Sequence, residues 1–184
     1  REREADSYAT REHIKTMRNQ MYRYALQFDI VTKNCAEFVR IGKEDDTASG
    51  VPFTQEDLDL LWKHKDLPFV DTILIYCYSG WRINELAKMP LSDIDLEAKT
   101  FTGGSKNRYS RNRTVPIHSR IYPMVLARYD TRFHSLIYHD GQQDISEEKY
   151  REYFNQALKA CGITEKHTPH DCRHTCNSLL LNAK

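Results

Sequence analysis

The segment His167–Cys176, HTPHDCRHTC, holds the densest group of side chains that could carry chemistry in this sequence. Thr168 and Pro169 predict a helix start, because threonine caps helices well and proline favours the first helical position. On a helix beginning at Pro169, His170 and Arg173 are three residues apart and share a face. Both fall near the helix N-terminus, where the helix dipole favours an anion. An imidazole beside a guanidinium there indicates a phosphate site with a group for proton transfer.

Two other interpretations of this segment stay open. His170 and His174 are four residues apart, which is the spacing of a zinc-hydrolase motif, and Cys172 and Cys176 could add thiolate ligands. Against zinc, Asp171 stands where that motif has glutamate, and the sequence contains no C-x-x-C pair. The third interpretation is structural: both cysteines form a buried stripe on the helix, since cysteine is a good small core residue. We expect this buried stripe whichever role His170 and His174 have.

A second candidate is Arg82, which follows the nearly continuous apolar run Phe69–Gly80 and Trp81. An arginine at this junction is anchored by the core yet directed outward, and its planar fork can bind two oxygens of one phosphate. Glu85 lies three residues on and could hold the guanidinium in place. The alternative is an ordinary surface ion pair.

The third candidate is a cluster of positive charge between Gly103 and Arg120, where no acidic residue occurs. Its members are Lys106, Arg108, Arg111, Arg113 and Arg120. A hairpin carrying these cations would present a positive edge that suits phosphate oxygens. The alternative is a solvated edge whose charges only discourage sheet-to-sheet aggregation.

The elements that position these candidates can be predicted from hydrophobic periodicity and turn residues. We expect helices over residues 11–28, about 54–62 with Thr54 as cap, 69–80, 83–89, about 121–129, 147–161 with Ser146 as cap, and from 169 onward. Short strands are expected at residues 94–96, 100–101 and 113–117. Helices, a small sheet and further helices predict an α+β fold that is mainly α.

Composition limits the domain organisation and the class of protein. The 184 residues carry 27 basic and 26 acidic side chains, so any nucleic-acid partner must be bound by local charge. The polar segment 44–51 predicts a linker between residues 1–43, too few for a core of their own, and a domain over residues 52–184. No apolar run approaches the roughly 20 residues that span a membrane. Five cysteines without a tight framework suit a reducing cytoplasm. The start at Arg1 suggests a piece of a longer protein.

Three boxes carry a resemblance to the tyrosine recombinases, the phage-integrase family. Ser79–Leu86, S-G-W-R-I-N-E-L, resembles their T-G-x-R-x-x-E-L box. Ser105–Ile117, S-K-N-R…R-T-V-P-I, is similar to their β-hairpin, and His167–Thr175 is similar to their H-x-L-R-H-T box. The boxes occur in the family's order over Val51–Lys184, and integrases of conjugative transposons and prophages are the most similar in style. Tyr22–Asn34 resembles the end of the family's core-binding domain.

The resemblance implies a role for each matching residue. Arg82 and Arg173 would hold the non-bridging oxygens of the scissile phosphate, and Glu85 would orient this group. Lys106 would protonate the leaving 5′-oxygen as general acid, and His170 would assist phosphate binding and proton transfer. The fold implied is the recombinase catalytic domain with its small antiparallel sheet and β-hairpin, preceded by a helical remnant of the core-binding domain.

The implied activity is site-specific breaking and rejoining of DNA through a 3′-phosphotyrosine intermediate, without metal or ATP. No tyrosine follows Arg173. The nucleophile would therefore lie beyond this chain, which we expect to bind DNA but not to cleave it alone. The implied partners are double-stranded DNA, contacted by Arg108, Arg111 and Arg113, a homotetramer on paired sites, and accessory excision or bending proteins. A bacterial cytoplasmic, nucleoid-associated location is expected. The alternatives are a catalytically inactive DNA-binding relative and the zinc hydrolase on His170 and His174.

Overall fold

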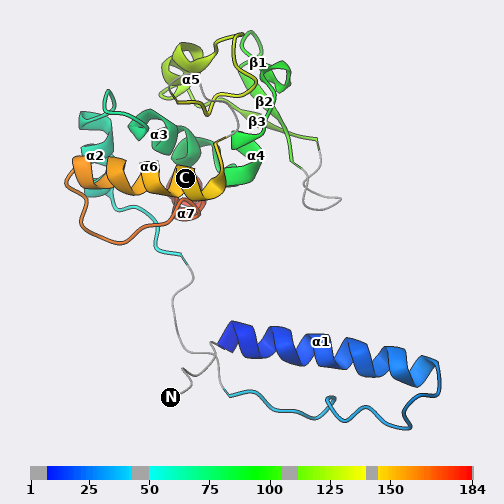
Figure 1. Ribbon diagram of the computed structural model, residues 1–184. Helices are drawn as coiled ribbons and strands as arrows, with labels where there is room; N and C mark the ends of the chain where they lie inside the picture. Colours follow the sequence, from blue (N-terminus) through cyan, green and yellow to red (C-terminus); the bar gives the residue numbers. More distant parts are fainter. Residues whose placement is uncertain (1–7, 43–49, 105–111, 140–144, 184) are drawn as a thin grey trace. The chain divides into compact units, whose positions relative to one another are not determined.

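The computed structural model describes residues 8–42, 50–104, 112–139 and 145–183 (Figure 1). The chain forms two compact units, Arg1–Ser49 and Gly50–Lys184. Their division falls within the segment 44–51. None of the helices among the described residues is both long and apolar enough to span a membrane.

The first unit contains helix α1 (Tyr8–Gln27), followed by residues 28–42 without regular secondary structure. The helix expected over residues 11–28 is confirmed, but the described part of the unit does not bury its apolar side chains. Met17, Met21 and Tyr24 are all more than half exposed. Asn34 donates a hydrogen bond to Asn19 at 3.0 Å, which ties the following segment back to α1.

The second unit is mainly helical with one small sheet, which confirms the predicted α+β class. Its elements in chain order are α2 (Gln55–Lys63), α3 (Val70–Ser79), α4 (Ile83–Ala87), the short 3-10 helix η1 (Leu91–Asp93), β1 (Ile94–Asp95), β2 (Thr100–Gly103), β3 (Arg113–Pro116), α5 (Tyr122–Arg128), α6 (Glu147–Ala160) and α7 (Asp171–Asn182). The strands are antiparallel in the order β1-β2-β3.

Helix α3 forms the centre of the core, as its nearly continuous apolar sequence predicts. It packs against α2, α5, α6 and α7 (Figure 1). Residues 73–77 are fully buried on every side of the helix. An apolar helix of this kind is stable only inside a protein, because burying each large side chain contributes about 1.5–3 kcal/mol. The end of α3 is therefore a rigid platform for the residues that follow it.

The sheet brings the start of β3 next to the end of β2. Gly103 pairs with Arg113, and Thr102 pairs with Thr114. The segment between these strands, residues 105–111, lies outside the described residues, and with it Lys106, Arg108 and Arg111. Arg113 is the described residue of the expected cationic hairpin that the site below uses.

Two predicted helix caps are confirmed. The Thr54 hydroxyl accepts a hydrogen bond from the Asp57 backbone N–H, and the Asp57 carboxylate accepts one from the Thr54 N–H. This reciprocal pair is a capping box. The Ser146 side chain accepts from Lys149 N–H at the start of α6. After α6 the chain passes through Gly162 at φ 79°, a conformation that favours glycine.

The predicted start of the last helix at Pro169 is wrong by two residues, because α7 begins at Asp171. The reason is a local hydrogen-bonded turn. The Thr168 N–H and hydroxyl both donate to the Asp171 carboxylate, and the Asp171 N–H donates to the Thr168 carbonyl. Residues 168–170 therefore form a turn in front of the helix, and His170 directly precedes α7 rather than lying in it.

Candidate functional site

The candidate site begins where the end of α3 meets the first turn of α7. Arg173 Nη1 donates a hydrogen bond to the Gly80 carbonyl oxygen. Gly80 ends α3 at φ 64°, and a Cβ there would lie 3.0 Å from Cys176 Sγ on α7. Glycine is needed on both grounds, because other residues avoid this φ and a side chain would push α7 away. The close approach fixes Arg173 beside the end of α3.

Arg82 and Arg113 share one buried carboxylate. Arg82 Nη1 donates to Glu85 Oε1 at 2.8 Å, and Arg113 Nη2 donates to Glu85 Oε2 at 2.9 Å. The Glu85 side chain is 5% exposed, whereas those of Arg82 and Arg113 are 28% and 22% exposed. The buried carboxylate thus holds both guanidinium groups in place, while part of each arginine side chain stays exposed to solvent.

Trp81 adds a platform for one of these guanidinium groups. The Arg113 guanidinium carbon lies 4.0 Å from the centre of the buried Trp81 ring. A cation over an aromatic face is attracted by the ring quadrupole, by about 2 kcal/mol where water is excluded. The Trp81 ring itself packs edge-on against Phe101 of β2. Strand β3 is therefore tied to the segment that carries Arg82.

The charges of these groups act on one another. Burial lowers the pKa of the Arg173 guanidinium, and the positive charges of Arg82 and Arg113 lower it further. Burial alone would raise the pKa of Glu85, but the hydrogen bond from Arg82 and the charge of Arg113 outweigh it, so this pKa lies below its usual range. Three guanidinium groups and one carboxylate leave an excess of two positive charges, and we call this group the arginine cluster.

His170 lies beside the arginine cluster with its side chain exposed. Partial burial, His174 and Arg173 lower the pKa of the His170 imidazole below its ordinary 6.5, in that order of importance. The imidazole is therefore neutral at pH 7 and can both accept and donate a hydrogen bond. The His170 and His174 rings pack edge-on, with their centres 4.9 Å apart.

The structure does not favour zinc at His170 and His174. Among the described residues, the group of three or more His, Cys, Asp or Glu side chains with ligand atoms close enough to share a metal ion is elsewhere. Cys172 and Cys176 are buried in the helix interface, as the structural interpretation expected. His174 lies against the chain at Gly50, where a Cβ would come within 2.3 Å of its Cδ2 atom.

The structure brings together most of the predicted site residues that it describes. Arg82, Glu85 and Arg173 meet in one cluster, with His170 beside it. Arg113, predicted to contact a phosphate backbone, joins the same cluster. Lys106, Arg108 and Arg111 lie outside the described residues. Arg120, the remaining cation of the predicted positive cluster, follows β3. Its guanidinium carbon lies 4.3 Å from the centre of the Trp62 ring, and its Nη1 donates to the Tyr78 hydroxyl at 3.0 Å.

Sequence reasoning missed two contributions to the site, the Gly80 carbonyl and the Trp81 ring. Both stand in the box S-G-W-R, between the buried helix and Arg82. A glycine and a tryptophan directly before a candidate arginine were the available signal. The sequence of this box does not show which distant side chains contact Gly80 and Trp81, because Arg173 comes from α7 and Arg113 from β3.

Residues 53–184 match the model of the phage integrase family. Over 177 residues the chain is 23% identical to the tyrosine recombinase XerC of Pediococcus pentosaceus, covering 88% of this chain and 58% of that protein. The chain thus spans less than two thirds of that curated relative.

Solved structures of integrases share the fold at low sequence identity. The Tn1549 transposon integrase, in complex with circular intermediate DNA, has a TM-score of 0.76 and 22% identity, with 96% of this chain and 67% of that chain covered. Lambda integrase, as a dimer bound to a COC' core site, has a TM-score of 0.75 and 17% identity, with coverage of 96% and 68%. The integrase from mycobacterium phage Brujita has a TM-score of 0.61 and 21% identity, with coverage of 98% and 61%.

Proposed function

Because the chain belongs to the phage integrase family, we propose that it provides the phosphate-activating part of a site-specific DNA recombinase. The whole protein would break and rejoin DNA through a 3′-phosphotyrosine intermediate, with the nucleophilic tyrosine outside this chain. The observation that carries the proposal is the arginine cluster, in which Arg82 and Arg173 lie beside His170 with a net excess of positive charge.

The arginine cluster suits the charge that develops during attack on a phosphodiester. When a tyrosine oxygen attacks phosphorus, negative charge accumulates on the non-bridging oxygens until the 5′-oxygen departs. Guanidinium groups already fixed by Glu85 and the Gly80 carbonyl need no rearrangement at that moment. The positive charges of Arg82 and Arg113 repel that of Arg173 and help to lower its pKa. A bound anion would offset this repulsion, so the cluster favours anion binding. We therefore assign Arg82 and Arg173 to the phosphate oxygens and Glu85 to positioning them.

His170 and Lys106 complete the proposed proton chemistry. The neutral His170 imidazole can donate a hydrogen bond to a phosphate oxygen or accept the tyrosine proton. Lys106 would give a proton to the leaving 5′-oxygen. A DNA strand with a 5′-thiolate leaving group needs no such proton. We expect Lys106→Ala to abolish cleavage of the oxygen substrate in the complete gene product but to leave cleavage of the sulfur substrate. An equal loss on both substrates would contradict this role.

Double-stranded DNA is the proposed partner, and DNA binding can be tested on the 184-residue chain. Arg108, Arg111 and Arg113 are assigned to the phosphate backbone, which positions the protein without reading sequence. Each neutralised phosphate contributes about −0.9 to the slope of log K against log salt. Arg108→Ala should therefore reduce the slope by about one. Arg151→Ala on α6, whose arginine is paired with Glu147, is the matched control. An unchanged slope for Arg108→Ala would contradict the assignment.

The wider assembly belongs to the same proposal. Residues 1–43 would be the end of a core-binding domain, 44–51 a linker and 52–184 the catalytic domain. The complete protein would act as a homotetramer on paired DNA sites, with accessory excision or bending proteins, at the bacterial nucleoid. Mass measurement of the complex with DNA carrying two sites tests the stoichiometry. Four copies are expected, and a complex that never exceeds two would contradict the tetramer.

A further inference from the structure

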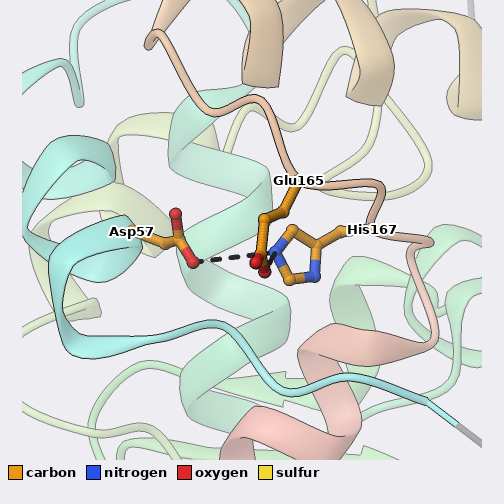
Figure 2. A group of neighbouring side chains, drawn as sticks. All are labelled: Asp57, Glu165 and His167. Atoms are coloured by element: carbon orange, nitrogen blue, oxygen red, sulfur yellow. Dashed lines mark ion pairs between the residues drawn. The ribbon is translucent and has the colours of Figure 1, made fainter. Parts of the chain in front are cut away.

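Three potential metal ligands meet where the segment that leads into α7 contacts the start of α2. His167 Nε2 lies 3.7 Å from Asp57 Oδ2 and 3.9 Å from Glu165 Oε2 (Figure 2). Asp57 is in the first turn of α2, whereas Glu165 and His167 belong to the connection between α6 and α7. One ligand atom from each residue lies within 4.8 Å of the other two. We call these residues the carboxylate–histidine cluster.

The hydrogen bond at the far side of the His167 ring settles which nitrogen is free. Nδ1 lies 3.2 Å from the Val51 carbonyl oxygen, which can only accept, so Nδ1 carries the hydrogen. In the neutral ring Nε2 then presents a lone pair toward two carboxylates. The His167 side chain is fully buried, and among the described residues Nε2 has no hydrogen-bond partner. A buried lone pair that faces negative charge is unfavourable unless a cation lies between them.

The distances fit a metal ion between the ligands better than a hydrogen-bonded proton. A proton shared in a hydrogen bond would draw nitrogen and oxygen to about 2.7–3.2 Å. In a tetrahedral zinc site with bonds of about 2.0–2.2 Å, neighbouring ligand atoms lie about 3.4 Å apart. The observed 3.7 and 3.9 Å are too long for hydrogen bonds and close to the tetrahedral value. Small side-chain shifts would complete the coordination.

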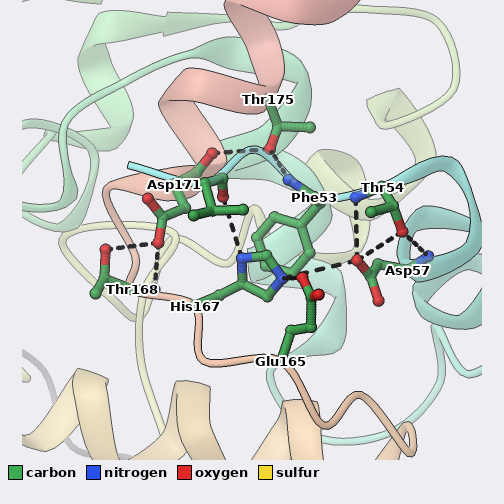
Figure 3. A network of polar contacts seen from close by, with 9 residues as sticks. Phe53, Thr54, Asp57, Glu165, His167, Thr168, Asp171 and Thr175 are labelled. Carbon is green, nitrogen blue, oxygen red and sulfur yellow. Dashed lines mark hydrogen bonds and ion pairs between the residues drawn. The ribbon is translucent and has the colours of Figure 1, made fainter. Parts of the chain in front are cut away.

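Outer contacts already orient two of the ligands, as they do around known metal sites. The Thr54 N–H and hydroxyl donate to Asp57 Oδ2 at 3.0 and 2.7 Å (Figure 3). Phe53 stacks on the His167 ring with centroids 4.0 Å apart. The Glu165 side chain is 63% exposed, which gives an ion access and leaves room for a water ligand.

We propose that Asp57, Glu165 and His167 bind a divalent cation, and that Zn²⁺ is the ion that fits. Two carboxylates and a neutral imidazole carry a charge of −2, which a divalent ion neutralises. Mg²⁺ and Ca²⁺ require six or more ligands, mostly oxygens, whereas imidazole with carboxylates in a four-coordinate site suits zinc. The ion would join the start of α2 to the segment before α7 and so stabilise the position of His170 and Arg173. It would take no part in the phosphate chemistry.

The test is zinc binding by the 184-residue chain after removal of metal with EDTA. Titration with ZnCl₂ against a chromophoric chelator should show one site per chain. Glu165→Gln should weaken binding at least tenfold, and because Glu165 is exposed this variant should keep the fold, as circular dichroism would check. His167→Gln should abolish binding. Glu97→Gln, at an exposed glutamate after β1, is the matched control and should leave binding unchanged.

Two further readouts locate the ion. Zinc at about a hundred times its Kd should raise Tm by roughly 5–10 °C in the unaltered chain and by much less in Glu165→Gln. X-ray absorption at the zinc edge should show only nitrogen and oxygen ligands. The proposal is overturned if no zinc binds or if sulfur ligands appear. It is also overturned if His174→Gln, or Cys35→Ser at the exposed cysteine after α1, removes the zinc while Glu165→Gln does not.

Discussion

The arginine cluster and the carboxylate–histidine cluster each include residues of the short segment 165–173, and they differ in the sign of their excess charge. In the first, Glu85 is outnumbered by guanidinium groups and both of its oxygens are hydrogen-bonded. In the second, two carboxylates outnumber one imidazole, and a buried nitrogen lacks a partner. The first arrangement is complete without a ligand and still attracts an anion, whereas the second is balanced only when a cation is present.

This difference has a structural origin. The arginine cluster is held by regular elements, since the Gly80 carbonyl at the end of α3 accepts from Arg173, and β3 places Arg113 over the Trp81 ring. The carboxylate–histidine cluster uses a residue that already has another task, because Asp57 closes the capping box of α2. An ion there would act on the same connection that delivers His170 to the arginine cluster.

The largest expected effect concerns two glycines, Gly80 at the end of α3 and Gly162 after α6. Gly80→Ala should lower the free energy of unfolding by about 3 kcal/mol, because it combines left-handed backbone strain with a close contact to Cys176 Sγ. Gly162→Ala has a similar φ but nothing within 4 Å of its Cβ, so about 1 kcal/mol is expected. Chemical denaturation measures both. Equal losses would show that the contact between α3 and α7 does not constrain the arginine cluster.

The next comparison replaces one carboxylate in each cluster. Glu85→Gln should lower the free energy of unfolding by about 2 kcal/mol. It removes the negative charge that pairs with the partly buried guanidinium groups of Arg82 and Arg113. Glu165→Gln, measured in EDTA, should change stability by less than about 0.5 kcal/mol, since an exposed carboxylate is lost from a cluster with excess negative charge. A large loss for Glu165→Gln in EDTA would contradict the difference between the clusters.

A smaller effect is expected in the acid dependence of stability. The pKa of Glu85 is lower in the folded protein than its ordinary 4.5. The stabilisation that this shift represents is therefore complete above about pH 4.5 and is lost as the pH falls through the lower folded value. Denaturation between pH 6 and pH 3 should show a steeper loss for the unaltered chain than for Glu85→Gln. Parallel curves would mean that Glu85 is not held by the guanidinium charges.

Local sequence signals predicted the elements well wherever the cause was local. The apolar run of α3, the Thr54 and Ser146 caps and the stop near Gly162 were all correct. The start of α7 was wrong because the Asp171 side chain bonds back to Thr168 and forms a turn before the helix.

The family resemblance predicted that Arg82 and Arg173 serve one phosphate with Glu85 orienting them, but local patterns did not predict the contacts that hold these side chains together. Glu85 as the partner of Arg82 follows from a spacing of three residues, whereas its second partner Arg113 arrives from β3. The meeting of Asp57 with His167 depends on how the connection before α7 folds over the start of α2, which no local pattern encodes. Charge pairs between distant elements need the tertiary structure, because propensity and periodicity describe only neighbours in the chain.

The most direct test of the proposed function is formation of a covalent protein–DNA complex by the complete gene product. The substrate would be a nicked DNA with the junction sequence of the mobile DNA element that carries the gene. Cleavage near the nick would release a short oligonucleotide, and because its 5′-hydroxyl is lost the reaction cannot reverse and the 3′-phosphotyrosine adduct is trapped. The unaltered protein should form this adduct, and Arg82→Lys, which keeps the charge but loses the planar fork, should slow it by about a hundredfold. Arg151→Lys should have no effect. Adduct formation at an unchanged rate in Arg82→Lys would contradict the role of the arginine cluster, and DNA binding without any adduct would identify an inactive relative.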